Sequence, residues 1–341
     1  MNYYKNKKIL VIGGTGTIGT KMVQELLKLE PMVIRIFSRD EYKQFVMQNS
    51  IKDLSSLRFL IGDVRDYDRV ERAMDGIDIV FNLAAMKHVP ACEYNPTEAI
   101  KTNVEGMENV IRAATYHKVQ CVLFTSTDKA ISPVNAYGAT KLLAEKLVQA
   151  ANYSKGSIKT KFVVVRFGNV MGSRGSVIPF FKEQILNKGE ITVTDGKMTR
   201  FMMTQQQAVN LTLIAVEKAL GGEVFVLKMP IILLKDLAEV IIEETCSKYS
   251  LSKNEIKIRE IGLRAGEKMF EELMTKEEAQ YAYDLENMFA VTPVNFDTIK
   301  YQNFYLNSKR AEQKSYTSSE ANPINKEQIR KIIIEENLLS L

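Results

Sequence analysis

The sequence contains few residues of the kinds that cross-link a protein or anchor it in a membrane. Its 341 residues include only three cysteines, Cys92, Cys121 and Cys246, which are widely spaced and odd in number. Such cysteines do not form a disulfide framework, so we expect a protein of the reducing cytoplasm. The apolar runs are only a few residues long, whereas about 20 residues are needed to span a bilayer. The chain also opens without a basic segment followed by an apolar one, so we expect neither a signal peptide nor membrane attachment.

Histidine is also scarce, and no charge of one sign is concentrated in one place. The two histidines are His88 and His117, and no cysteine or histidine pair has ligand spacing, so we expect no metal site. Lysine and arginine number 46 against 41 aspartates and glutamates, a formal net charge of +5. Because this excess is spread along the chain, we expect no nucleic-acid partner. It is compatible with a local positive potential near an anionic substrate.

The chain has the composition of an ordinary globular protein, and its predicted strands and helices alternate regularly. Hydrophobic residues make up 45% and charged residues 26%, and the length suggests one large domain or two domains. Short apolar strands are predicted at residues 7–14, 32–37, 57–61, 78–84, 120–125 and 161–166. Helices are predicted at residues 17–29, 68–74, 96–117 and 134–153. This alternation predicts an α/β fold with a doubly wound, parallel Rossmann sheet covered on both faces.

The alternation of elements changes after about residue 170. Helices are predicted there at residues 180–188, 205–220, 236–249 and 326–338, and strands at residues 222–228 and 257–261. We therefore expect a dinucleotide-binding domain over residues 1–170, to which residues 204–228 return. A smaller substrate-binding domain is expected over residues 171–203 and 229–292. Residues 293–341 are expected to form a C-terminal tail with a terminal helix.

A glycine-rich turn joins the first predicted strand to the first predicted helix. It is Gly13-Gly14-Thr15-Gly16-Thr17-Ile18-Gly19. Its glycines allow a tight turn and a close approach to a pyrophosphate, and the following helix N-terminus offers free N–H groups. A glycine motif alone can equally be a tight strand-to-helix turn. Its position within a βαβ unit favours dinucleotide binding, with contacts expected from Gly13, Thr15, Gly16, Thr17, Ile18 and Gly19.

The end of the second strand bears on which dinucleotide is bound. An acidic residue there would bind the ribose of NAD, but this chain has Ser38 and Arg39. Arg39 can pair with a 2′-phosphate, so we expect NADP. NAD stays open, because Arg39 can equally be a solvated loop residue and because Asp40 follows it. The other expected cofactor contacts are Ser38, Asp63, Val64, Ala84, Ala85, Lys87, Asn103, Tyr137 and Lys141.

A candidate catalytic group follows the fifth strand. The strand runs into Thr125-Ser126-Thr127-Asp128-Lys129, and Tyr137 and Lys141 come next at a spacing of i, i+4. That spacing places the tyrosine and the lysine on one helical face. There the charge of Lys141 can lower the pKa of the phenol, and a tyrosinate can take a proton from a sugar hydroxyl. By itself this pair also occurs by chance on solvated helices.

Together these features resemble the extended short-chain dehydrogenase/reductase family over about the first 300 residues. Within the family the chain is most similar to the UDP-N-acetylglucosamine 4,6-dehydratases, and among these to the soluble inverting enzymes of pseudaminic acid biosynthesis. The matching stretches are Ser38-Arg39-Asp40-Glu41, Ala85-Met86-Lys87-His88-Val89-Pro90, Ser126-Thr127-Asp128-Lys129-Ala130, Pro133-Val134-Asn135, Arg166-Phe167-Gly168-Asn169-Val170-Met171-Gly172-Ser173-Arg174-Gly175-Ser176, Met198-Thr199-Arg200-Phe201 and Arg264-Ala265-Gly266-Glu267-Lys268.

The resemblance implies a lyase reaction with bound NADP. Tyr137 removes the C4 hydroxyl proton while a hydride passes from C4 to NADP, and the hydride later returns to C6. Lys129 takes the C5 proton, provided that burial or the nearby Lys141 lowers its pKa. Asp128 protonates the departing C6 hydroxyl, provided that it is held neutral. Thr127 completes the expected catalytic set. Asp128 and Lys129 can equally form a surface ion pair, but ligands bind at the carboxyl ends of such strands.

The resemblance also implies the substrate, UDP-N-acetylglucosamine, and a UDP-sugar-binding role for the smaller domain. Arg200 and Arg264 are expected to hold the diphosphate, since guanidinium groups suit phosphate oxygens. The expected substrate contacts are Lys87, Asn169, Val177, Thr199, Arg200, Arg264 and Glu267.

Several alternatives remain open at this point. The product can be inverted or retained at C5. A UDP-N-acetylglucosamine 4-epimerase would begin with the same oxidation at C4, and related epimerases also carry a Thr-Asp-Lys run, so Asp128 and Lys129 alone do not decide between the two. A non-enzymatic redox sensor or scaffold is disfavoured, because Tyr137 and Lys141 are intact. The family commonly forms dimers or hexamers, so we expect a homo-oligomer.

Overall fold

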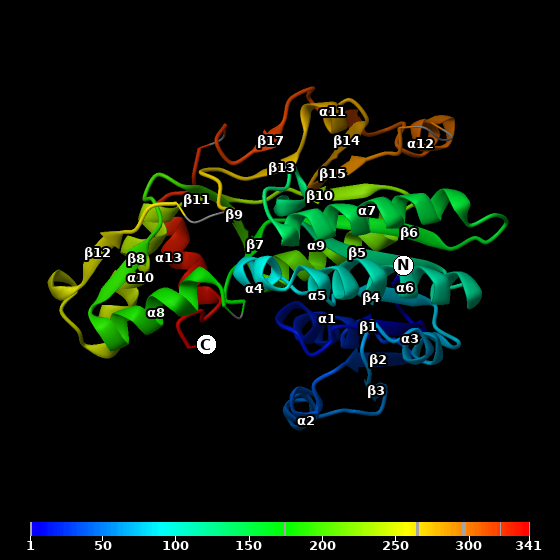
Figure 1. Ribbon diagram of the computed structural model, residues 1–341, viewed down its shortest axis with the longest axis horizontal. Helices are drawn as coiled ribbons and strands as arrows, with labels where there is room; N and C mark the ends of the chain where they lie inside the picture. Colours follow the sequence, from blue (N-terminus) through cyan, green and yellow to red (C-terminus); the bar gives the residue numbers. More distant parts are fainter. Residues whose placement is uncertain (1, 174, 264–265, 295–297, 321, 341) are drawn as a thin grey trace.

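The structure is a computed structural model of the chain. It describes all residues except 1, 174, 264–265, 295–297, 321 and 341 (Figure 1). Over this part of the chain, no helix has the length and apolar character needed to cross a bilayer.

Ten described strands form one large sheet. Its parallel part has the order β3 (Leu57–Ile61), β2 (Val33–Ser38), β1 (Lys8–Ile12), β4 (Ile79–Asn82), β5 (Cys121–Thr127), β6 (Lys161–Phe167) and β10 (Val224–Leu227). Three antiparallel strands extend the β10 edge: β15 (Met288–Val291), β14 (Ala282–Leu285) and β16 (Lys309–Arg310). The predicted α/β fold with a doubly wound Rossmann sheet is thus confirmed.

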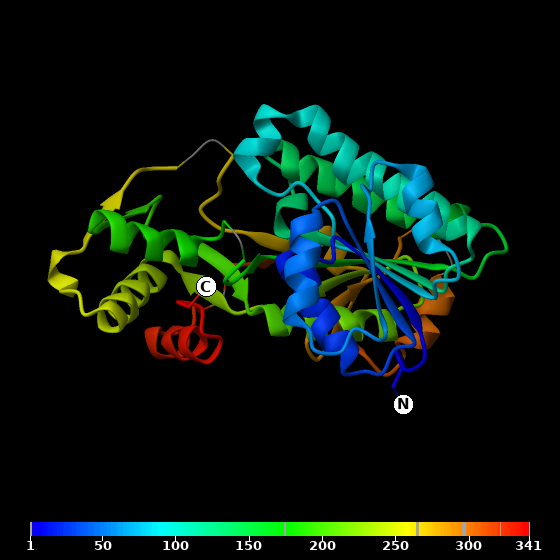
Figure 2. The ribbon, with the colours of Figure 1, turned by 90° about the horizontal axis from the view of Figure 1, so that it is seen from below.

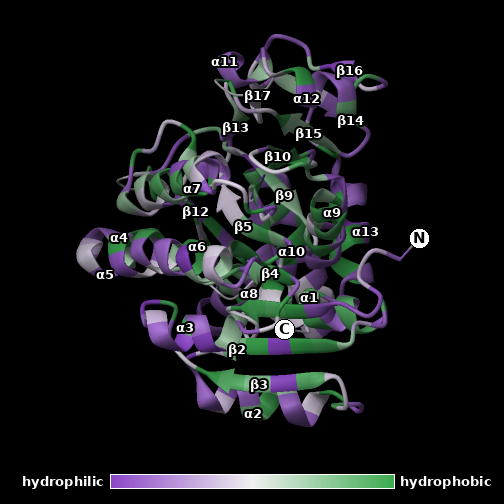
Figure 3. Cartoon of the chain, turned by 90° about the vertical axis from the view of Figure 1, so that its right-hand side faces the viewer, coloured by the Kyte–Doolittle hydropathy of each residue, from purple (hydrophilic) through white to green (hydrophobic). Residues whose placement is uncertain are grey.

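Helices cover both faces of this sheet (Figure 2). On one face α1 (Thr17–Leu27) packs against α9 (Gln205–Lys218), and on the other α6 (Gly106–Tyr116) packs against α3 (Tyr67–Met74) and α7 (Ala136–Ser154). The central strands are largely apolar, as their green colouring in Figure 3 shows, and their side chains are buried. This double burial explains why each strand was recognisable as a short apolar run.

Three details of the first half differ from the sequence prediction, and one is the short helix α4 (Val89–Tyr94), which was not predicted. Helix α2 (Glu41–Ser50) was not predicted, and Asp40 caps its N-terminus by accepting a hydrogen bond from the backbone of Lys43 at 3.0 Å. The helix predicted over residues 96–117 is α5 (Pro96–Ile100), a π-helical turn (Lys101–Glu105) and α6. A π-helical turn is rare and often marks a functional site.

A second lobe is built around a separate apolar cluster that includes Ile178, Ile191 and Ile241. Its strands are β7 (Asn169–Val170), β9 (Thr199–Met203) and β11 (Ile231–Leu233) in one small sheet, and β8 (Glu190–Val193) with β12 (Lys257–Glu260) in another. Its helices are α8 (Val177–Lys188), α10 (Leu234–Tyr249) and the short 3-10 turn Lys253–Glu255. In Figure 1 this lobe lies to one side of the large sheet.

The expected domain boundaries can be compared with these positions. Strand β10 and helix α9, from residues 204–228, lie with the large sheet. Strands β14 and β15 also lie in the large sheet, although they belong to the segment 229–292 that we assigned to the smaller domain. These two strands form a hairpin of four residues each, and strands this short leave little trace in a hydrophobic pattern.

The tail after residue 293 contacts both lobes. Helix α12 (Thr298–Phe304) lies beside the large sheet, and β16 is an edge strand of that sheet. Strand β17 (Tyr316–Thr317) pairs with β13 (Glu272–Met274) next to the short helix α11 (Lys276–Ala279). The terminal helix α13 (Lys326–Glu335) packs on α10, where Arg330 Nε lies 2.8 Å from Glu244 Oε1.

Candidate active site

The glycine-rich turn lies between β1 and α1, as the sequence predicts. Gly13 has a φ of +80°, and a Cβ on it would lie 2.8 Å from the backbone nitrogen of Ala84, just after β4. A Cβ on Gly19 would lie 2.4 Å from the carbonyl oxygen of Gly13. Gly16 begins the helix without a side-chain cap, so its N-terminal N–H groups stay available. The turn therefore fits a dinucleotide pyrophosphate by its backbone geometry.

Three predicted cofactor residues meet at the ends of β2 and β3. Arg39 Nη1 lies 3.7 Å from Asp63 Oδ2, and its side chain is 60% exposed. Asp63 also accepts from Arg65 Nε at 2.9 Å and Nη2 at 2.7 Å. Burial raises the pKa of Asp63, but the hydrogen bonds from Arg65 outweigh it and the pKa is lowered. Ser38 is buried, and its hydroxyl accepts from Gln44 at 3.0 Å. Arg39 is thus the accessible cation at this edge, beside a carboxylate that stays ionised.

Asn103 has a positioning role that the sequence did not reveal. It lies in the π-helical turn, where its side-chain oxygen accepts from the Met86 backbone at 2.9 Å. Its amide donates to the Met86 carbonyl and to Thr140 Oγ1, both at 3.0 Å. These bonds tie the loop after β4, which carries Ala84, Ala85 and Lys87, to helix α7.

The end of β5 turns sharply through a 3-10 turn, Asp128–Ala130. The hydroxyl of Thr127 donates to Asp128 Oδ1 at 2.8 Å, and Lys129 Nζ lies 2.9 Å from Asp128 Oδ2. The Asp128 side chain is only 2% exposed. The pair is therefore not a fully solvated surface ion pair, because Asp128 is buried and only 30% of the Lys129 side chain is exposed.

Helix α7 packs closely on that turn and brings Tyr137 to it. Asn135 caps the helix by accepting from the Gly138 backbone at 2.8 Å. A Cβ on Gly138 would lie 2.0 Å from the carbonyl oxygen of Lys129, so only glycine permits this contact. Tyr137 is buried beside Thr127, with which it forms a hydrogen bond. Burial raises the pKa of Tyr137 to about 12, although the charge of Lys129 lowers it.

Lys141 lies on the same helix, one turn after Tyr137. Its Nζ donates to the Thr125 carbonyl at 2.7 Å and lies 4.2 Å from the centre of the Phe124 ring. Burial lowers the pKa of Lys141 to about 7. The charge of Lys129 lowers the pKa of the Tyr137 phenol, and the expected effect of Lys141 on the phenol stays a prediction.

The protonation states of Asp128 and Lys129 also differ from those expected. Burial raises the pKa of Asp128, but the charge and hydrogen bonds of Lys129 outweigh it and lower the pKa overall. Burial lowers the pKa of Lys129, but Asp128 and Glu271 outweigh it and raise the pKa. In the resting protein Asp128 is therefore an anion and Lys129 a cation, the reverse of what the expected acid and base roles need.

Glu271 is a site residue that the sequence analysis missed. It is buried, and its Oε1 lies 3.4 Å from Lys129 Nζ, 3.2 Å from Asn169 Nδ2 and 3.3 Å from Arg200 Nε. Its Oε2 accepts from the Phe201 backbone at 3.2 Å. Burial and the nearby Asp128 carboxylate raise the pKa of Glu271 to about 7. The sequence offered one signal, since Glu271 follows the matching stretch 264–268 by three residues.

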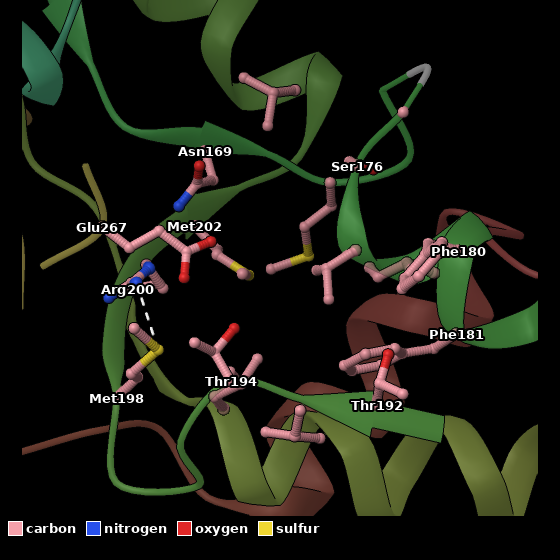
Figure 4. Close-up of a pocket in the computed structure, with 17 residues that line it drawn as sticks. Asn169, Ser176, Phe180, Phe181, Thr192, Thr194, Met198, Arg200, Met202 and Glu267 are labelled. Carbon is pink, nitrogen blue, oxygen red and sulfur yellow. Dashed lines mark hydrogen bonds between the residues drawn. The ribbon is translucent and has the colours of Figure 1, made fainter. Parts of the chain in front are cut away.

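A cavity of about 370 Å³ opens beside this cluster in the second lobe (Figure 4). Four expected substrate residues line it: Asn169, Val177, Arg200 and Glu267. Ser176 also lines it with a buried hydroxyl that has no hydrogen-bond partner in the described part of the chain. Figure 4 shows Asn169, Arg200 and Glu267 together on one wall and Phe180 and Phe181 on another. The cavity thus offers a charged and an apolar side to one ligand, in the size range of small-molecule sites.

The other expected substrate residues have different positions. Thr199 lies outside the set of described residues that line the cavity, and its hydroxyl lies 2.9 Å from Ser318 Oγ of the tail. Lys87 is exposed on the loop after β4. Arg264 lies outside the residues that the structure describes. His88, next to Lys87, contacts the loop after β7, because a Cβ on Gly175 would lie 2.5 Å from its ring.

Comparison with known proteins shows the family. A family model described as polysaccharide biosynthesis protein matches residues 9–293. The chain belongs to this family. A Campylobacter jejuni protein named UDP-N-acetylglucosamine 4,6-dehydratase (inverting) is 43% identical over 293 residues, 85% of this chain and 84% of the relative. A Rickettsia bellii protein named UDP-glucose 4-epimerase is 40% identical over 337 residues, 97% of this chain and 96% of the relative.

The fold agrees closely with that of a solved structure. Pen from Bacillus thuringiensis is 53% identical, with a TM-score of 0.92 over 98% of this chain and 99% of that one. These matches confirm the predicted relationship to the extended short-chain dehydrogenase/reductase family.

Proposed function

We propose that the protein is a UDP-N-acetylglucosamine 4,6-dehydratase that forms a 4-keto-6-deoxy sugar nucleotide with inversion at C5. The observation that carries this proposal is the buried Asp128–Lys129 pair beside Tyr137, at the carboxyl end of β5. Oxidation and reduction at C4 need one protein base, the tyrosine, besides the dinucleotide that carries the hydride. A buried acid and base next to it are what the removal of water across C5 and C6 requires in addition. The inverting dehydratase from Campylobacter jejuni, 43% identical, supports the same activity.

The residues have the following roles in this proposal. A bound nicotinamide dinucleotide would accept a hydride from C4 and later return it to C6. Tyr137 takes the proton of the C4 hydroxyl, which the oxidation makes acidic. The 4-ketone then acidifies the C5 proton, and the Asp128–Lys129 pair removes it and protonates the departing C6 oxygen. Thr127 bonds to Asp128 and to Tyr137, so it connects the two parts of the site.

The cofactor and substrate are proposed from their binding residues. Arg39 is exposed at the position where a 2′-phosphate would lie, which favours NADP over NAD. Arg200 lines the cavity and is the described cation we assign to the UDP diphosphate. Arg264, Val177 and Glu267 complete the proposed substrate contacts. We also propose a cytoplasmic homo-oligomer, a dimer or a hexamer.

The experiment is proton NMR of UDP-N-acetylglucosamine incubated with the purified protein in D2O. We expect a new C6 methyl signal with deuterium at C5, and the ring coupling constants of the product report inversion or retention. A product that keeps its C6 protons as a hydroxymethyl group would contradict the dehydratase.

A 4-epimerase is the second candidate. The Rickettsia bellii relative named UDP-glucose 4-epimerase is 40% identical over almost the whole chain, including the tail region. In the same NMR experiment a growing UDP-N-acetylgalactosamine anomeric signal, without a methyl signal, would favour this candidate.

A further inference from the structure

Glu271 belongs to a buried trio of ionisable groups that the proposed mechanism uses only in part. Lys129 Nζ lies 2.9 Å from Asp128 Oδ2 and 3.4 Å from Glu271 Oε1, so one ammonium faces two carboxyl groups. Glu271 comes from the segment leading into β13, 142 residues further along the chain than Lys129. Its backbone nitrogen donates to Ser318 Oγ at 2.9 Å, which fixes the carboxyl in place from the tail.

The number of protons on this trio decides what it can do. If both carboxyls were ionised, two anions would hold the proton on Lys129 and it could not act as a base. If Glu271 carries a proton, Asp128 is the only carboxylate that competes for the Lys129 proton. Two carboxyl groups so close together in a buried site favour the form with one shared proton.

We propose that Glu271 is a positioning residue that works in its neutral, protonated form: it leaves Asp128 as the sole anion facing Lys129, so that Lys129 can pass its proton to Asp128 before the elimination. This inference rests on the dehydratase function proposed above. It reconciles the resting charges of Asp128 and Lys129 with the roles that the elimination needs.

The protons balance through the cycle. The shift from Lys129 to Asp128 leaves a neutral amine and a protonated carboxyl. Lys129 then takes the C5 proton as the C5–C6 double bond forms, the C6–O bond breaks, and the oxygen leaves as water with the Asp128 proton. When the hydride reaches C6, a water molecule protonates C5 on the opposite face, which inverts C5, and Lys129 releases to the solvent the proton that it took. Tyr137 enters the cycle as a phenolate, a form that the positive charge of a bound oxidised nicotinamide would favour against the effect of burial. The proton that it takes from the C4 hydroxyl passes through Thr127 to Asp128, and a final shift from Asp128 to Lys129 restores the resting state. Glu271 keeps its proton throughout.

The proposal predicts a pH dependence. Burial and the Asp128 carboxylate raise the pKa of Glu271 to about 7, and the charges of Lys129 and Arg200 oppose them. Asn169 and the Phe201 backbone face Glu271 as uncharged donors. The rate of elimination is therefore expected to be constant below this pKa and to fall above it by about tenfold per pH unit.

Lys141 has a similar pKa, so the two reaction steps must be measured separately. In a single turnover, the rise of reduced-nicotinamide absorbance reports C4 oxidation, to which Tyr137 and Lys141 contribute. Its decay reports the elimination and the steps after it. The fall in rate above pH 7 that Glu271 causes, here called the alkaline limb, is expected in the decay only.

The test uses Glu271→Gln, which imitates the protonated side chain, with Glu272→Gln as a matched control one residue away. We expect Glu271→Gln to keep the decay rate within about tenfold of the wild type below pH 7 and to lose the alkaline limb. KM is expected to change little, and the control is expected to keep the limb. Glu271→Asp retains a carboxyl and is expected to retain a limb. Infrared spectra of the resting protein should show a protonated-carboxyl band that titrates near pH 7 and is absent in Glu271→Gln.

The outcomes separate the two proposals. An inactive Glu271→Gln that is folded, or one with an unchanged limb, would overturn the role of Glu271. If Glu271→Gln does not fold, two other results would overturn the role of Glu271. One is a wild-type protein without the titrating infrared band, and the other is a Glu271→Asp variant without the alkaline limb. A wild type that forms no C6 methyl product would instead refute the dehydratase itself.

Discussion

Replacement of Arg166 by methionine is expected to destabilise the protein strongly. Arg166 lies on β6 with 1% of its side chain exposed, and it binds both carboxylate oxygens of the equally buried Glu145 at 3.1 and 2.7 Å. It also donates to the Leu273 carbonyl at 2.9 Å and pairs with Glu278 at 3.0 Å. Removing the guanidinium leaves the Glu145 anion buried without its partner, which costs about 3–5 kcal/mol.

The free energy of unfolding can be measured by urea titration followed by circular dichroism. We expect the midpoint of Arg166→Met to fall with little change in the slope. Adding Glu145→Gln removes the unpaired charge, so the double variant is expected to be more stable than Arg166→Met alone. Arg259→Met is the surface control, because Arg259 is 61% exposed beside Glu190, and such pairs contribute about 0–1 kcal/mol.

The buried pairs of Arg166 are expected to contribute more to stability than a surface ion pair does. A loss below about 1 kcal/mol for Arg166→Met would place it with the surface pairs and refute the argument from burial. A double variant as unstable as Arg166→Met would show that packing, rather than the unpaired Glu145, caused the loss.

Three further changes test the site. Gly138→Ala places a Cβ where the Lys129 carbonyl lies, so we expect kcat to fall about 100-fold while the circular dichroism spectrum stays unchanged. A variant with wild-type turnover would contradict the close contact. Gly19→Ala meets the Gly13 carbonyl at 2.4 Å, and we expect calorimetric titration to show lost dinucleotide binding, whereas unchanged affinity would refute the fit of the turn to a pyrophosphate. Arg39→Ala is expected to weaken NADP about 10- to 100-fold relative to NAD, and an unchanged ratio of the two Kd values would remove the argument for NADP.

The sequence by itself determined the Rossmann half of the fold. Strands buried on both faces must be apolar over short runs, and glycines 13, 16 and 19 mark the turn between the first strand and helix, so both features are local. The spacing of Tyr137 and Lys141 placed them on one helix for the same reason. The hairpin of β14 and β15 was missed, because each strand has only four residues and because β15 joins the sheet by pairing with β10, about 60 residues earlier in the chain.

Tertiary structure alone decided the chemistry of the site. Spacing predicted that Lys141 would act on Tyr137, but it did not reveal that packing also brings the charge of Lys129 to the phenol. The second lobe and the tail bring Glu271 to Lys129 across 142 residues, a contact that no local pattern encodes. Protonation states depend on burial and on the charges within a few ångströms, and both are fixed only when distant segments of the chain pack together.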